Sequence, residues 1–123
     1  MNTEPIESNA SGIVKISEDV IMVIASKEVS EVENVVGLYS PSKQGFLGLK
    51  GNNKSVRSEI KNKNAKIDMD ITVKYGTVIA DTALVIQERV KKAVESMTGL
   101  NVESVNVTVK SIQFPEETVS SEE

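Results

Sequence analysis

The sequence contains no cysteine and no histidine. Without them the chain has no disulfide, no thiol nucleophile, no imidazole base and none of the usual zinc ligands. Histidine is the commonest acid–base catalyst, so an enzyme of this composition would depend on carboxylate, Lys, Ser or Tyr chemistry. We therefore expect a protein that is not an enzyme, with no catalytic residues, no metal site and no cofactor.

Aromatic residues and long apolar runs are also scarce. Only 3% of the 123 residues are aromatic while 39% are hydrophobic, so the core of this single small domain has to be aliphatic. The longest purely apolar run, 20–25, is far shorter than the about 20 residues that a membrane-spanning helix needs. Residues 1–7 lack the basic and apolar segments of a signal peptide. We expect a cytoplasmic protein that reaches the inner face of the membrane only through a partner or at its surface.

Charge is distributed unevenly along the chain, whose formal net charge is −4. Segments 1–11 and 115–123 contain acids but no Lys or Arg, and we interpret them as a disordered N-terminal tail and an acidic C-terminal tail. Segment 43–66 contains seven bases and a single acid, Glu59. Such a segment suits phosphates, anionic lipid headgroups or an acidic partner, although the same residues also solubilise a loop and a hairpin. The candidate interaction surface consists of Lys43, Lys50, Lys54, Arg57, Lys61 and Lys63.

Segment 66–75 alternates strictly between apolar and polar residues, which predicts a strand with one dry and one wet face. The dry face consists of Ile67, Met69, Ile71, Val73 and Tyr75. On the other face, Asp68 and Asp70 could form a metal-binding or acid–base pair. Because they alternate with Lys and Thr, we interpret them as part of a solvated face. We expect Tyr75, like Tyr39, to be packed.

The remaining periodicity predicts strands at 12–16, 35–39, 56–60 and about 103–113, and helices from 18 to about 30 and from 79 to 98. Ser17 is the expected N-cap of the first helix, and Gly99 is expected to end the second. Asn residues predict a hairpin turn at 61–64. The result is an α+β fold over 12–114, in the order β-α-β-β-β-α-β, with two helices and a mixed sheet of four to five strands. Strands 66–75 and 103–113 are either parallel neighbours or separated by another strand.

The loop between 40 and 53 contains Gly45-Phe46-Leu47-Gly48 beside basic residues. This resembles the GxxG loop with which KH domains hold a nucleic-acid backbone. The KH loop follows a helix directly, however, whereas here a strand and Pro41 precede it. We therefore favour a mobile connection and keep a KH-like nucleic-acid-binding module, acting through the basic 43–66 region, as the alternative function.

Five segments carry a family resemblance: 16–20, 32–37, 67–76, 86–99 and 105–109. Together they resemble the alkaline-shock, envelope-stress-response family of Gram-positive bacteria, the Asp-twenty-three-like proteins. The helix ending in Met97-Thr98-Gly99, followed by Val-Asn-Val, is the most specific part. The chain departs from the family in loop 40–53 and at 77–80, where relatives often carry a proline.

The resemblance implies a protein without established catalytic residues or cofactor, abundant in the cytoplasm and able to form homo-oligomers. It also implies attachment near the membrane through small membrane-anchored partners, and in some members a link to lipid synthesis. The leading hypothesis is thus a non-catalytic, envelope-stress-related structural or regulatory protein that acts by self-association and by binding such a partner. Nucleic acid is not an expected partner under this hypothesis.

Overall fold

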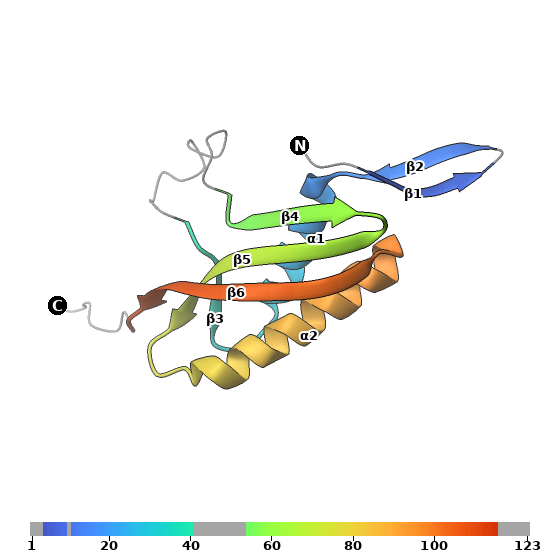
Figure 1. Cartoon of the computed structure of the whole chain (residues 1–123). Coiled ribbons are helices and arrows are strands. Elements are labelled where there is room, and N and C mark those ends of the chain that lie inside the picture. The colour runs from blue at the N-terminus through green and yellow to red at the C-terminus, as the bar shows by residue number, and fades with distance from the viewer. Residues whose placement is uncertain (1–3, 10, 41–53, 116–123) are drawn as a thin grey trace.

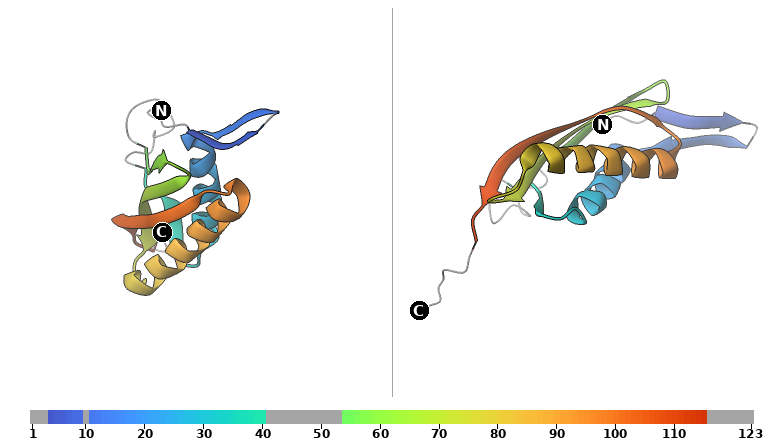
Figure 2. Two further views of the ribbon diagram at one scale, coloured as in Figure 1. Left: turned by 45° about the vertical axis from the view of Figure 1, so that its right-hand side comes forward. Right: turned by 90° about the horizontal axis from the view of Figure 1, so that it is seen from below.

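The computed structural model describes residues 4–9, 11–40 and 54–115. Its elements follow the order β1 (Glu4–Asn9), β2 (Gly12–Ile16), α1 (Glu18–Ser30), β3 (Val35–Leu38), β4 (Val56–Lys61), β5 (Asn64–Lys74), α2 (Ile79–Thr98) and β6 (Asn101–Gln113). A four-stranded mixed sheet has both helices on one face, while β1 and β2 form a separate two-stranded sheet (Figures 1 and 2). The predicted α+β class is confirmed.

The sheet is built around β5. One edge of β5 pairs in parallel with β6 over its whole length, from Asn64↔Asn101 to Lys74↔Gln113. Its other edge is shared, because β4 pairs antiparallel with the first half and β3 with residues 71–73. Strands β5 and β6 are therefore parallel neighbours, which decides between the two arrangements that the sequence left open.

The core lies between the sheet and the helices and is aliphatic. From β5, Ile67, Met69 and Ile71 are fully buried. They meet a stripe of α2 whose side chains Ile86 and Val90 are also fully buried. Apolar alternation therefore located the core correctly up to Val73. Past that residue the helices no longer cover the strand, and Tyr75 is 63% exposed, so its predicted packing in the core is wrong.

The two helices are joined at the surface by one arginine. Arg89 on α2 donates to the Glu28 carboxylate at 3.0 Å and to the Glu31 carboxylate at 2.9 Å, both at the end of α1. Lys27 also forms an ion pair with Glu31, one helical turn away. This cluster fixes the side of α1 that faces α2.

Turns and caps follow local chemistry. Asn62 and Lys63 both have positive φ, 52° and 68°, as a two-residue hairpin between twisted strands requires. Gly99 ends α2 with φ 77° and donates its N–H to the Glu95 carbonyl at 3.0 Å. Ser17 occupies the N-cap position of α1, but its side chain forms no capping hydrogen bond.

The N-terminal segment is ordered in a way that the sequence did not predict. Strand β1 pairs with β2 from Glu4↔Ile16 to Asn9↔Gly12, so the interpretation of 1–11 as a disordered tail is wrong for 4–9. The pairing depends on backbone groups of the adjacent segment, which a search for apolar periodicity does not detect. This hairpin extends away from the main sheet (Figure 1). The predicted acidic tail lies outside the described residues from position 116 onward.

Candidate interaction surfaces

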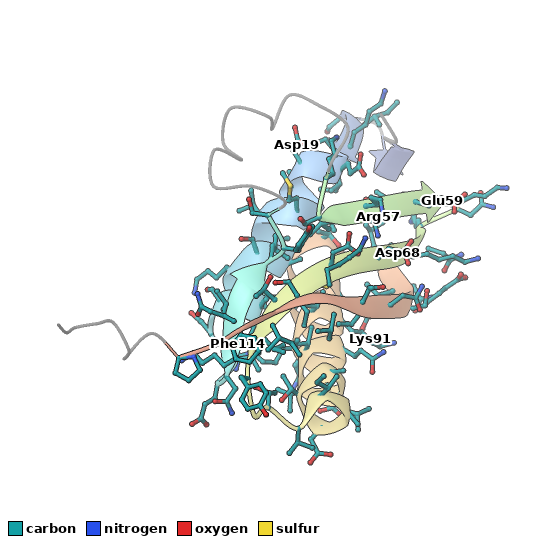
Figure 3. All side chains as sticks on the ribbon, turned by 90° about the vertical axis from the view of Figure 1, so that its left-hand side faces the viewer. Asp19, Arg57, Glu59, Asp68, Lys91 and Phe114 are labelled. Carbon is teal, nitrogen blue, oxygen red and sulfur yellow. The ribbon has the colours of Figure 1, made fainter. Side chains whose placement is uncertain are left out.

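The face of the sheet opposite the helices is polar and internally bonded. Arg57, Glu59 and Asp68 project from it (Figure 3). Arg57 on β4 donates two hydrogen bonds to the Asp70 carboxylate on β5, at 3.1 and 3.2 Å. Asn106 on β6 donates to Asp68 at 2.8 Å. The sheet surface is therefore a set of cross-strand bonds rather than a row of independent solvated side chains.

Asp70 corrects the interpretation of this face as simply solvated. The residue is only 8% exposed, and its charge is balanced by Arg57. The hydrogen bond from Arg57 to Asp70 raises the pKa of the guanidinium, against the opposing effect of desolvation. Asp68 is thus hydrogen-bonded to Asn106, and Asp70 is bound to Arg57. The two carboxylates therefore do not form a free acid–base pair.

The predicted basic surface is divided by the structure. Lys43 and Lys50, like the Gly45–Gly48 loop, lie outside the described residues. Lys54 is 3.7 Å from the Glu18 carboxylate, and Arg57 is bound to Asp70.

The remaining candidates, Lys61 and Lys63, lie at the other end of β4. At ~3.3 Å per residue, Lys61 is about 13 Å from Arg57 and about 23 Å from Lys54 along the chain. They adjoin a shallow hollow of about 230 Å³ whose lining is of mixed charge: Glu59, Lys61, Asn62, Asn64, Lys66 and Glu103. The described bases therefore do not form one continuous patch, and their role in binding stays a prediction.

Within 11–40 and 54–115, no group of three or more Asp or Glu side chains is arranged to hold a metal ion. Among the helices in these ranges, none has the length and apolar character that a membrane crossing needs.

An exposed apolar surface lies at the end of β5 and β6, and the sequence did not predict it. The rings of Tyr75 and Phe114 stack with centroids 5.0 Å apart, and the residues are 63% and 65% exposed. Ile112, paired in register with the buried Val73, is 44% exposed. We call Tyr75, Ile112 and Phe114 the aromatic end.

The aromatic end continues the core-facing side of the sheet beyond the helices. The ladder extends past Lys74, because the Tyr75 N–H donates to the Gln113 carbonyl at 2.9 Å. Alternation then places Tyr75 on the same face as Val73. A hollow of about 450 Å³ lies here, lined by Lys74, Tyr75, Gln113, Phe114 and Pro115. The sequence signal was an aromatic residue at the end of each of two strands, in a chain with only two Tyr and two Phe.

Several curated proteins are similar to this chain. The uncharacterized protein Spy1614 of Streptococcus pyogenes serotype M6 (strain ATCC BAA-946 / MGAS10394) is 34% identical over 107 residues, which cover 83% of this chain and 88% of the relative. The uncharacterized proteins YloU and YqhY of Bacillus subtilis (strain 168) are 32% and 29% identical, over 83% and 88% of this chain and 89% and 82% of their own length.

Among solved structures, MamM-CTD superposes with a TM-score of 0.49 at 18% identity, over 77% of this chain and 99% of that one. A family model, described as the Asp-twenty-three family with a cell envelope-related function, matches residues 6–114. The resemblance seen in the sequence is thereby confirmed, and the chain belongs to the Asp-twenty-three family, whose function is related to the cell envelope.

Proposed function

We propose that the protein is a non-catalytic structural or regulatory component at the cytoplasmic side of the cell envelope. It acts by self-association and by binding a partner protein that is membrane-anchored or linked to lipid synthesis. The observation that carries the proposal is the aromatic end, where two stacked rings remain exposed on a sheet face that is otherwise core. Contiguous exposed apolar surface of this kind is typical of protein–protein contact sites.

The size of the aromatic end favours weak, reversible self-association. An aromatic side chain buries about 150–250 Å², so four rings, already about 35% covered, would bury roughly 500 Å² in a symmetric contact between two copies. At about 25 cal/mol per Å² this contributes on the order of 10 kcal/mol. Association itself costs about 4–15 kcal/mol, so the balance predicts a weak, reversible complex that is micromolar at its tightest.

The absence of catalysis is proposed on chemical grounds. The chain has no His or Cys, and the two aspartates that share a strand face are bonded to Arg57 and Asn106. An envelope role without a membrane-spanning helix in the described residues requires contact with another envelope component. A protein partner fits this requirement, because the exposed surface with the clearest chemistry is apolar and aromatic.

Sedimentation velocity over a wide range of protein concentrations tests the self-association. The wild-type chain should shift toward a larger species as concentration rises, and Tyr75→Ser or Phe114→Ser should weaken this association at least about tenfold. The matched control is Val23→Ser on α1, a residue 65% exposed, which should associate as the wild type does. A strict monomer at every concentration would contradict the proposal, as would equal association of all the variants.

A further inference from the structure

Side chains of α2 cover the outer edge of β6 over its first residues. Val102 donates its N–H to the Glu95 carboxylate at 2.9 Å, and its carbonyl accepts from Lys91 Nζ at 3.1 Å. The Val105 carbonyl accepts from Gln87 Nε2 at 2.9 Å. These three helix residues, spaced by four, form one stripe that replaces a neighbouring strand at this end of β6.

The hydrogen bonds from α2 to the outer edge of β6 stop at Val105, because the next side chain on this face of α2 is apolar. Three residues before Gln87, the same face of α2 continues with Leu84, which is 59% exposed and cannot hydrogen-bond to the strand. Since the Val105 carbonyl points outward, alternation directs the backbone groups of Val107 and Val109 outward as well. Within the described residues β6 pairs only with β5, so this second part of the strand is an open edge above an exposed leucine.

We propose that the outer edge of β6 from Val107 to Ile112 binds an extended segment of a partner protein as an added strand. The inference rests on the proposed function and identifies how its partner is recognised. Main-chain hydrogen bonds to Val107 and Val109 supply the affinity, and side chains on alternate positions of the incoming strand pack on Leu84. This segment of the partner therefore has apolar residues at every second position.

Charge indicates a second property of the partner segment. Between Asn106 and Gln113, β6 has one charged side chain, Lys110, and no carboxylate. The Lys110 ammonium lies 5.9 Å from the centre of the Tyr39 ring and forms no ion pair with the described acids. Tyr39 follows β3 on the far side of β5, so the ammonium reaches across the sheet in this structure. Turned toward the outer edge, the long Lys110 side chain would pair with a carboxylate on the polar side of the incoming strand. The expected ligand is thus an apolar and acidic alternating segment.

A single strand fits this edge better than a second copy of the chain. Helix α2 runs alongside β6 (Figures 1 and 2), so pairing two β6 strands edge to edge would also bring two α2 helices together beneath them. Helices pack no closer than about 8–10 Å, whereas paired strands are about 4.8 Å apart. An extended peptide needs space for one strand only.

Two edge variants and a library of random linear peptides displayed on phage provide the test. The library is panned on the full wild-type chain, and the selected peptides are synthesised and titrated by fluorescence anisotropy. They should alternate apolar residues and include Asp or Glu, and they should protect the Val107 and Val109 amides from hydrogen exchange. Val107→Pro, which removes an outward N–H but no bond to β5, should weaken binding about tenfold or more.

Leu84→Lys provides a second variant at an exposed position where the fold is not at risk, and it too should weaken binding several-fold. Failure to select any peptide, or selected peptides that bind both variants as tightly as the wild type, would overturn the inference. Sedimentation velocity distinguishes failure of this inference from failure of the proposed self-association, because Val107→Pro should self-associate as the wild type does. If Val107→Pro instead abolished self-association, the edge would be occupied by a second copy and the inference would be wrong, while self-association itself would stand.

Discussion

Arg57 on β4 holds the carboxylate of Asp70 on β5 through two hydrogen bonds, 3.1 and 3.2 Å long. Asp70 marks the position at which β5 changes neighbours. Its N–H donates to the Ser55 carbonyl just before β4, and its carbonyl accepts from the Tyr39 N–H just after β3, both at 2.9 Å. The ion pair therefore ties β4 to β5 at the point where the shared edge is interrupted.

Breaking this pair on one side should destabilise the fold more than removing both charges. Arg57→Gln leaves the Asp70 carboxylate, whose side chain is 12% exposed, without its cation. Because Arg57 is 46% exposed and screened by solvent, the expected cost is about 1–2 kcal/mol. Urea unfolding of Arg57→Gln, Asp70→Asn and the double variant measures the coupling. Strictly additive costs would show that the pair contributes nothing.

Replacing Gly99 should lower the stability of the fold, because the backbone there has a left-handed conformation. Its φ of 77° is left-handed, and a Cβ added there would meet no atom within 4 Å. Gly99→Ala is therefore expected to lower the free energy of unfolding by about 1 kcal/mol through conformation alone. Gly99→Asn, a residue that adopts this conformation more readily, is the matched control and should cost less. Equal stability of wild type and Gly99→Ala in thermal unfolding would rule out this explanation.

The turn between β4 and β5 should become more stable with a glycine. Lys63 has φ 68°, a conformation that glycine adopts without strain, and Asn-Gly is the preferred pair for such a turn. Lys63→Gly should raise the free energy of unfolding by about 0.5–1 kcal/mol, as seen in chemical denaturation. Lys61→Gly, in the strand before the turn, should lower it instead. Destabilisation by Lys63→Gly would mean that its side chain matters more than its backbone.

Acid should weaken the ion pairs at the end of α1. The hydrogen bond from Lys27, followed by the charges of Lys27 and Arg89, lowers the pKa of Glu31 below its ordinary value of 4.5. A lowered pKa in the folded state stabilises the protein above the ordinary pKa and loses this contribution as pH falls through the lower one. The Tm advantage of wild type over Glu31→Gln should therefore shrink as pH falls below about 4.5.

Glu33→Gln, an exposed neighbour outside the cluster, serves as the control for this pH series. Its Tm difference from the wild type should change less with pH than that of Glu31→Gln. A Tm difference for Glu31→Gln that stays constant with pH would exclude the ion pair as its source.

Local periodicity was sufficient to predict much of this fold. The alternation of 66–75 and the spacing of α2 depend on burial of one face, so both helices and the main strands were located from the sequence. Long-range choices were not encoded locally. The parallel placement of β6, the pairing of β1 and the burial of Asp70 each depend on which segment lies beside it. Tyr75 was wrongly placed in the core because alternation along β5 does not reveal where the helical cover ends.

For the candidate surfaces, too, the sequence predicted local features but not tertiary contacts. Local composition identified the basic residues, but only the tertiary structure shows Lys54 beside Glu18 and Arg57 bound to Asp70. The aromatic end joins residues 39 positions apart in sequence, Tyr75 and Phe114, through the β5–β6 pairing. No single window of the sequence contains both.

Fractionation of bacterial cells tests the central claim most directly. In a Gram-positive host lacking its own copy, the wild-type chain should be recovered with the membrane fraction together with a protein partner. The Tyr75→Ser/Phe114→Ser double variant, with unchanged thermal unfolding, should move toward the supernatant, because a monomer holds its partner at one site whereas an oligomer holds it at several. Val23→Ser should stay with the membranes. Recovery of the wild type entirely in the supernatant, or an equal distribution of all three proteins, would contradict the account.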